Sequence, residues 1–408
     1  MKKLNVKNQR KFNQWTVALA AVGVVSLASA ARADEKMSMV QTALSNTTIG
    51  GYVDTAATWR PGTDQNAAGG PNIPAYSFSK NDGFSLNAID IALDHPEDES
   101  PWAAGYHVEF MLGQDAVPGA GIRTAYLTLR TPVGNGIDWK IGVWDTIIGY
   151  ESSSDPLNPN YTRSYGYSIE PTTHTGILGT YKVNDMVTVQ AGVADGSNVG
   201  TPVAAINGTS ATESQKTYMG DLQLTAPDSA GFMKGATLTL GAINCVDSAT
   251  ATGHAPGTTS FYAGTTLPTP IAALKVGAAF DYLDIHDSGP TNPGNDSMWV
   301  VGLYTTYQAT DKLSFNLRGE YMNNGEISAA SNISNPLAPV NTAYALNQVE
   351  ELTATVQYQL WANVLSRVEF RWDHVEHGNA FGQAEGAPVS TPNRANDFLL
   401  ALNVIYQF

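Results

Sequence analysis

Apolar and polar side chains alternate along the last eleven residues of the chain, Phe398 to Phe408. Every second residue counted back from the end is apolar, and such residues share one face of a β-strand. The opposite face is mixed, with Leu399 and Ile405 between polar or small residues. The pattern therefore predicts a terminal strand with one apolar face. The apolar row consists of Leu400, Leu402, Val404, Tyr406 and Phe408.

A terminal strand of this kind leaves two architectures open. At an open sheet edge it would expose unpaired backbone groups and invite aggregation. In a closed barrel it would pair with the first strand, so that no edge remains. The alternative is the last strand of a soluble sandwich.

The same alternation recurs along the whole chain and favours the barrel. Segments of about ten residues with alternating character are typical of transmembrane barrels. We predict an all-β fold, a transmembrane up-and-down antiparallel β-barrel of about 16 strands, with roughly 14 to 18 as the range. The segments lie at roughly 46–59, 83–95, 102–115, 121–131, 136–145, 173–183, 186–195, 215–226, 235–246, 258–267, 273–286, 296–309, 312–325, 347–360, 363–375 and 397–408.

Charged residues occupy one face of several of these segments. Four charges share a face in segment 363–375, and such a row cannot lie in a dry sandwich core. A water-filled lumen could hold it, so we assign the charged faces to the lumen and the apolar faces to lipid. The outward residues include Ile141, Val143, Phe315, Leu317, Val368 and Phe370, and Asn316 faces inward. The lumen charges are Lys140, Lys275, Arg318, Arg367 and Arg371, with Asp54, Asp90, Glu109, Asp138, Asp221, Asp281, Glu320, Glu351, Glu369 and Asp373.

Short and long links between the segments mostly alternate. Asn184-Asp185 and Thr310-Asp311 are two-residue links suited to tight hairpins. Up-and-down outer-membrane barrels have short periplasmic turns and long outer loops. With an even number of strands, both termini are expected on the periplasmic side.

The link 146–172 after the fifth segment is among the longest and is rich in Tyr, Ser, Asn and Pro. We expect it either to fold into the lumen or to form an ordinary outer loop. If it folds inward, its tyrosines would pack against the wall and its charges would line the pore. The tyrosines are Tyr161, Tyr165 and Tyr167, and the charged candidates are Glu151, Asp155, Arg163 and Glu170.

Four short motifs resemble one family of barrels. They are Gly51-Tyr-Val-Asp-Thr, Phe84-Ser-Leu-Asn87, Gly142-x6-Gly149-Tyr-Glu151 and His174-Thr-Gly176. They are similar to the OmpL-like putative β-barrel porin family of Gram-negative bacteria. The resemblance implies a multi-pass barrel in the outer membrane, and it leaves the transported solute open. In general porins the loop after the fifth strand folds into the lumen. The terminal aromatic Phe408 resembles the signal by which such proteins engage the barrel assembly machinery, and a homotrimer is a candidate assembly.

The N-terminus predicts export. Basic residues precede an apolar run from Trp15 to Ala31, and Ala31-Arg32-Ala33 is a small-x-small cleavage site. We expect a signal peptide at 1–33, a short periplasmic segment at 34–45 and the barrel at 46–408. The alternative is an N-terminal anchor helix.

Charge and cysteine usage exclude several classes. Six of the 22 basic residues lie in the predicted signal peptide, which leaves 16 against 37 acidic residues. This balance argues against nucleic-acid partners and is compatible with a cation-attracting lumen. The single cysteine, Cys245, excludes an intramolecular disulfide.

No motif for catalysis, a cofactor or a structural metal occurs in the sequence. The one close histidine pair, His374 and His377, could touch a metal, although two nitrogens alone do not make a site. We therefore expect a passive channel for small hydrophilic solutes or ions, with weak cation preference and no enzyme activity. The alternatives are a structural barrel, a sheath for a partner protein, or a barrel enzyme with a dispersed triad.

Overall fold

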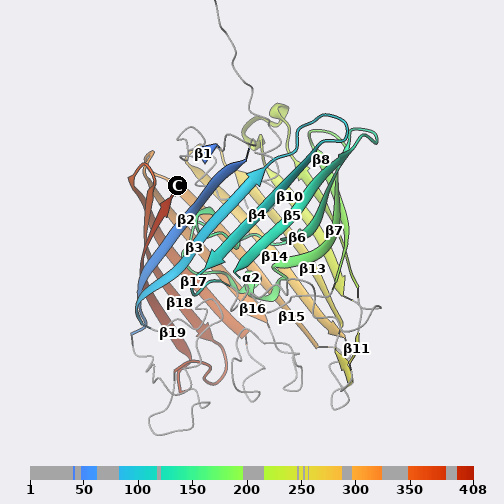
Figure 1. Ribbon diagram of the computed structural model, residues 1–408. Helices are drawn as coiled ribbons and strands as arrows, with labels where there is room; N and C mark the ends of the chain where they lie inside the picture. Colours follow the sequence, from blue (N-terminus) through green and yellow to red (C-terminus); the bar gives the residue numbers. More distant parts are fainter. Residues whose placement is uncertain are drawn as a thin grey trace, which may run out of the picture.

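The computed structural model describes residues 40–41, 47–61, 82–116, 121–195, 216–245, 248–250, 253–255, 257–286, 296–323, 348–382 and 393–408. Within this part of the chain, sixteen strands form one closed antiparallel barrel (Figure 1). They are β2 (Thr48–Trp59), β3 (Gly83–His95), β4 (Ala104–Leu112), β5 (Ile122–Thr131), β6 (Ile137–Asp145), β7 (Thr173–Lys182), β8 (Val187–Ala194), β9 (Thr217–Thr225), β10 (Thr237–Cys245), β13 (Gly257–Pro268), β14 (Leu274–His286), β15 (Asp296–Gln308), β16 (Leu313–Asn323), β17 (Gln348–Trp361), β18 (Val364–Val375) and β19 (Asn396–Gln407).

The prediction of a barrel of about sixteen antiparallel strands is confirmed, because each predicted segment coincides with one of these strands to within three residues at either end. Three further short strands were not predicted. β1 (Val40–Gln41) pairs with the start of β2, while β11 (Ser248–Thr250) and β12 (Gly253–Ala255) form a small separate hairpin. The predicted signal peptide 1–33 lies outside the described residues.

The two ends of the chain close the barrel. β19 pairs with β2, and the backbones of Phe408 and Gly51 exchange two hydrogen bonds of 3.0 and 3.1 Å. The Phe408 ring lies over Gly51, since a Cβ there would sit 2.9 Å from the ring carbon Cζ and 2.1 Å from the Asp90 carbonyl oxygen. The apolar terminal strand is therefore fully paired, and the open edge expected of a sandwich does not form.

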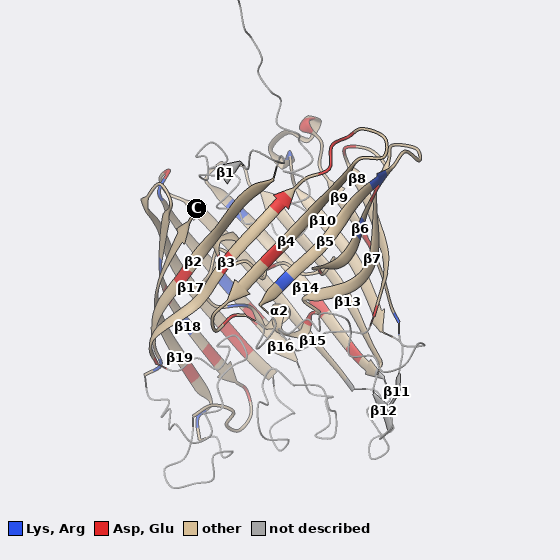
Figure 2. Ribbon diagram, viewed as in Figure 1, with Lys and Arg blue, Asp and Glu red and all other residues tan. Residues whose placement is uncertain are grey.

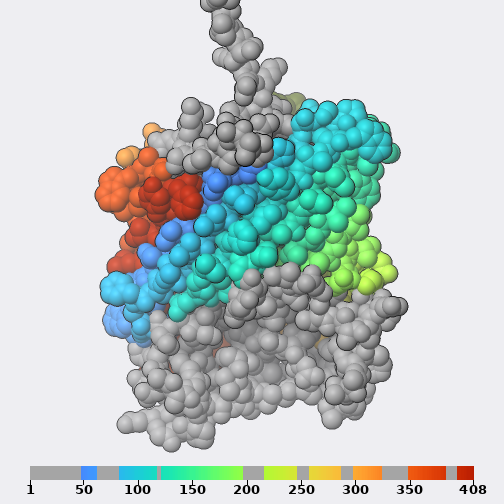
Figure 3. Space-filling model, in the orientation of Figure 1, coloured from blue at the N-terminus to red at the C-terminus, as the bar shows by residue number. Residues whose placement is uncertain are grey.

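The alternation along the strands separates an outer from an inner face. On β19, Leu402 is 53% exposed on the outer face, while its neighbour Asn403 is 1% exposed inside. The outer wall is continuous across β2 to β6 (Figure 3), and few residues of these strands are charged (Figure 2). Val143 was assigned to the lipid-facing side, but its side chain is buried. Its register partner Ala125 nevertheless belongs to the outer row of β5. The other residues assigned to lipid are exposed: Ile141, Phe315, Leu317, Val368 and Phe370.

Short turns gather at the end of the barrel where the C-terminus and β1 lie (Figure 1). Asn184 closes one of them, because its side-chain oxygen accepts the backbone N–H groups of Met186 and Val187. In another turn, the Thr310 hydroxyl oxygen accepts the backbone N–H of Leu313. Of the predicted long links, 146–172 is fully described, and those after the first, seventh and thirteenth segments fall largely outside the described residues.

The helical elements are short. They are the 3-10 turns η2 (Asp155–Leu157) and η3 (Asp228–Met233) and the α-helix α2 (Tyr165–Ile169). Among the described residues, no helix is long and apolar enough to cross a membrane.

The inner face is not uniformly polar. Near the long-link ends of β14 to β17, apolar side chains point inward and pack around α2. Phe381, from the segment after β18, completes this cluster at 1% exposure. The cluster contains Tyr165, Ile169, Leu283, Ile285, Met298, Val300, Met322, Val349, Val375, Ala380 and Phe381. The barrel therefore has an apolar core of its own, which simple alternation between lipid and water does not predict.

Candidate functional site

The link 146–172 turns into the barrel after β6 and returns at its root, where the Thr146 N–H donates to the Thr172 carbonyl at 3.0 Å. Figure 1 shows α2, which belongs to this link, inside the wall near mid-height. We call residues 146–172 the inner loop. Its contacts with strands on several sides of the barrel show that it lies against the inner wall.

The first part of the inner loop is held by apolar contacts. Ile147, Ile148 and Tyr150 pack into a second buried cluster, in which the rings of Tyr150 and Tyr304 stack at 4.0 Å. Small inner residues make room for them. A Cβ on Gly277 of β14 would lie 1.9 Å from the Tyr150 hydroxyl oxygen, so a larger residue there would displace the Tyr150 ring.

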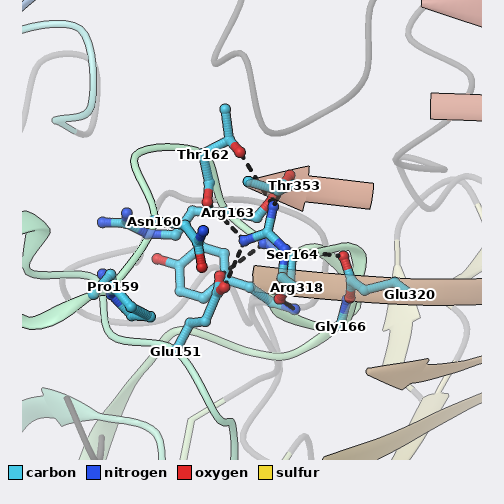
Figure 4. Close-up of polar contacts among 12 residues, drawn as sticks. Glu151, Pro159, Asn160, Thr162, Arg163, Ser164, Gly166, Arg318, Glu320 and Thr353 are labelled. Atoms are coloured by element: carbon cyan, nitrogen blue, oxygen red, sulfur yellow. Dashed lines mark hydrogen bonds and ion pairs between the residues drawn. The ribbon is translucent and has the colours of Figure 1, made fainter. Parts of the chain in front are cut away.

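Arg318 of β16 joins the inner loop to the wall (Figure 4). Its Nη1 donates to Glu151 Oε1 at 2.7 Å and to the Thr162 carbonyl at 2.8 Å. Its Nη2 donates to Glu351 Oε1 of β17 at 3.2 Å. The side chain is fully buried, so its charge is compensated by the carboxylates of Glu151, Glu320 and Glu351 and by loop carbonyls instead of water.

Arg371 of β18 makes a parallel set of contacts. Its Nη1 donates to the Arg163 carbonyl at 2.6 Å, and its Nη2 donates to Asp373 Oδ1 at 2.8 Å. The guanidinium also lies 5.0 Å from the centre of the Tyr165 ring. The two arginines thus bind consecutive carbonyls of one loop segment.

Arg367 of β18 holds the turn η2. Its Nη2 donates to the carbonyls of Asp155, at 3.1 Å, and of Asn158. The Asn158 side chain in turn makes two hydrogen bonds with the backbone of Ser152. Its Oδ1 accepts the Ser152 N–H at 2.8 Å, and its Nδ2 donates to the Ser152 carbonyl at 2.8 Å. This part of the inner loop is therefore braced internally as well as by the wall.

Two wall carboxylates bind loop N–H groups. Glu369 accepts the N–H groups of Tyr161 at 2.5 Å and Thr162 at 2.9 Å, and also the Thr162 hydroxyl at 2.7 Å. Glu320 accepts the N–H groups of Tyr165 at 2.8 Å and Gly166 at 3.2 Å, at the start of α2. Carboxylates are favourable partners for the unpaired N–H groups at a helix start.

Two loop residues complete the network. Arg163 pairs with Asp155 at 2.6 Å inside the loop. The carboxyl of Glu170 faces that of Asp281 on β14, and burial together with this neighbour raises the pKa of Glu170 well above its ordinary value. Both causes disfavour the charged form of Glu170.

The structure brings nine of the ten predicted pore-lining residues to the inner loop or the wall that it touches. Lys140 lies apart on β6, with its Nζ 5.0 Å from the centre of the Tyr126 ring. Asn316, also assigned inward, donates to the Pro159 carbonyl at 3.0 Å. The nine are Glu151, Asp155, Arg163, Glu170, Arg318, Glu320, Arg367, Glu369 and Arg371.

The charged row on β18 does not face an open, water-filled space. Glu369, Arg371 and Asp373 have no exposed area, because the inner loop covers them and their partners satisfy them. The row faces the interior of the barrel, where it borders the inner loop and not water.

Sequence reasoning missed the hydroxyl and amide groups of the network. Thr162, Thr353 and Thr355 are buried and bond its charged members, and Asn160 donates to Thr355 Oγ1 at 2.7 Å. The spacing in the sequence could have identified two of them, since Thr353 and Thr355 follow Glu351 at intervals of two residues and therefore share its face of the strand.

No metal centre is evident. The described residues contain no group of three or more His, Cys, Asp and Glu arranged to hold an ion. His374 stacks on Trp372 and contacts Asn396 on the outer row of β18.

Comparisons with known proteins give the same architecture. The family model described as "Putative beta-barrel porin-2, OmpL-like" matches residues 46–408. A comparison with curated proteins finds no match. The solved outer membrane channel DcaP of Acinetobacter baumannii is 12% identical, with a TM-score of 0.61 over 90% of this chain and 99% of that one. An anion-selective porin from Comamonas acidovorans is 11% identical, with a TM-score of 0.56 over 89% and 99%. The trimer form of OmpT from Vibrio cholerae is 14% identical, with a TM-score of 0.54 over 89% and 99%.

Proposed function

Because the chain belongs to the OmpL-like putative beta-barrel porin-2 family, we propose that it is a passive diffusion channel for small hydrophilic solutes with a weak preference for cations. The observation that carries this proposal is a closed barrel with an apolar outer face and an inner loop fixed against its inner wall. Solutes diffuse down their gradients through the remaining space. No covalent step is needed, so the channel requires no catalytic residue, no cofactor and no metal.

The cation preference follows from which lumen charges remain exposed. Arg318, Arg367 and Arg371 are at most 2% exposed and are bound by the inner loop. Elsewhere on the wall, on β3 and β5, the Asp94 side chain is 38% exposed, whereas Arg123 is 12% exposed. Exposed carboxylates attract cations and repel anions, and salt screens them beyond about 8 Å at physiological ionic strength. The preference is therefore weak and grows as salt is lowered.

The membrane placement is part of the same proposal. The outer-membrane barrel carries its short turns and its C-terminus at one end, which we assign to the periplasm. The exported chain, after loss of residues 1–33, is folded by the barrel assembly machinery, which recognises the terminal row ending in Phe408. The trimer form of OmpT supports a homotrimer as the assembly.

Planar bilayer recordings test the proposal. Purified protein should give stepwise conductance increases, and the reversal potential in a low-salt KCl gradient should show cation preference. Asp94→Asn should reduce that preference. The matched control Glu350→Gln, on the exposed outer row of β17, should leave it unchanged. A barrel that inserts without conducting would indicate a structural role instead. A clear anion preference at low salt would contradict the cation assignment.

A further inference from the structure

A second chain of ionisable side chains crosses the inner wall away from the arginines that hold the inner loop. His107 of β4 lies between two carboxylates, with its Nδ1 3.3 Å from Asp94 Oδ1 and its Nε2 3.5 Å from Glu109 Oε2. Glu109 is paired in turn with Arg123 of β5, and Arg123 Nη1 lies 2.5 Å from Asp145 Oδ1 at the end of β6. We call these five residues the wall chain.

The wall chain is accessible at its two ends. Asp94 and Asp145 are 38% and 48% exposed, while Glu109 in the middle is 6% exposed. The chain runs from the short-turn end of β3 to the root of the inner loop, where Ser153 Oγ donates to Asp145 Oδ1 at 3.2 Å. The charged ends of the wall chain are therefore accessible beside the inner loop, and the backbone of that loop does not compensate their charges.

The charge of the wall chain depends on one proton. Three carboxylates against one guanidinium leave two excess negative charges when the imidazole is neutral. An imidazolium at His107 reduces this excess to one. Glu109, Arg123 and Asp145 hold one another in ion pairs, and Asp94 is paired with His107, so the imidazole is the member whose protonation changes the sum.

The surroundings of His107 match a proton-dependent role. A neutral imidazole donates through one nitrogen only, so hydrogen bonds to both carboxylates require the imidazolium. The ring also stacks on Tyr126, with centroids 5.1 Å apart and an interplanar angle of 21°. The charged and titratable groups around it are Asp94 of β3, Glu109 of β4, Arg123 and Tyr126 of β5, and Lys140 of β6 above the Tyr126 ring.

We propose that His107 is a specificity-determining residue that makes the cation preference of the channel depend on pH. The inference rests on the proposed channel function and assigns its tuning to the wall chain. Below the titration of His107 the imidazolium weakens the attraction for cations. Above it, the neutral ring leaves the full negative excess, and the preference for cations over anions rises.

Two substitutions that fix the charge in opposite states test this. The measurement is the K⁺/Cl⁻ permeability ratio, from reversal potentials in a low-salt KCl gradient at pH 5 and pH 10. A unit charge about 8 Å from the ion path in a water-like medium changes the local K⁺ concentration about two-fold and the Cl⁻ concentration about two-fold in the opposite sense. His107→Gln should therefore give a ratio about four-fold higher than wild type at pH 5, and at pH 10 the two should agree. His107→Lys should match wild type at pH 5 and lie about four-fold below it at pH 10.

The control is His374→Gln, which removes a histidine from the outer row of β18 and should follow wild type at both pH values. Heat-modifiable migration on gels checks that each variant is folded. Equal ratios for His107→Gln and wild type at both pH values would overturn the inference while leaving the channel function intact. Shifts of His107→Gln and His107→Lys in the same direction would also overturn it, since they would reflect distorted structure. Absence of conductance in wild type would overturn the proposed function and, with it, this inference.

Discussion

Replacing Glu369 by glutamine should weaken the docking of the inner loop on the barrel wall. The carboxylate accepts the N–H groups of Tyr161 and Thr162 and the hydroxyls of Thr162 and Thr355, all within 2.9 Å. Glutamine keeps the shape but replaces one accepting oxygen by an NH₂ group. That group would face two donors, and at least one buried N–H would lose its partner.

The expected cost follows from these contacts. A hydrogen bond to a charged group contributes about 1.5–3 kcal/mol, and an orphaned buried donor costs about 1–3 kcal/mol. Losing charge assistance and one acceptor should therefore weaken loop docking by about 3 kcal/mol, which is more than a hundredfold in the ratio of docked to undocked loop. Arg318 and Arg371 still hold the loop, so we expect brief excursions and not permanent release.

Single-channel recording in KCl measures this directly. Glu369→Gln should show a larger mean conductance and greater open-channel noise than wild type. Glu350→Gln on the neighbouring strand removes an exposed outer carboxylate and should behave as wild type. If Glu369→Gln gives the same conductance and noise as this control, the carboxylate does not hold the loop, and the reasoning from its contacts fails.

Three further predictions concern assembly, lipid contact and pH. Deleting Phe408, which closes the barrel against Gly51, should reduce heat-modifiable protein in the outer-membrane fraction, and wild-type levels would contradict its role as an assembly signal. Leu317→Arg on the outer face should destabilise the folded barrel by about 2–4 kcal/mol if the site is near the bilayer midplane. Gln223→Arg on the inner face of β9 should be tolerated. Equal amounts of folded protein for the two variants would contradict the assigned faces. Burial, together with Asp138, raises the pKa of Glu97 in the β3–β4 turn to about 7. Because the folded-state pKa of Glu97 lies above its unfolded value, its contribution to stability is lost as pH rises toward 7. The urea midpoint of wild type should therefore fall from pH 5 to pH 8, and that of Glu97→Gln should fall less. Parallel pH curves for the two proteins would refute this.

The strands were predictable because the two faces of each strand meet different surroundings. Hydrocarbon outside selects Leu402 and Val404, and the polar interior selects Asn403, so a period of two appears in the sequence itself. The turns were predictable for a similar local reason. Asn184 and Thr310 close their hairpins with side chains that bond the backbone two or three residues away.

The sequence could not show what covers the inner face. Leu283, Met298 and Ile405 interrupt the polar row that alternation predicts, yet each is buried in an apolar cluster inside the barrel. An apolar residue at an inward position can mean that the segment is not a barrel strand, or that its inner face is covered by other apolar side chains. Only the folded loop distinguishes the two.

What the sequence alone determined about this protein is therefore the barrel: the approximate number of strands, their bounds within a few residues, and the face to which most of their side chains point. All of these follow from local periodicity. The tertiary structure decided the fate of the charges, because the partners of Arg318 and Glu369 lie 167 and 207 residues away in sequence, on the inner loop. Pairing over such separations depends on how the closed wall presents its inner face, and no local pattern encodes that geometry.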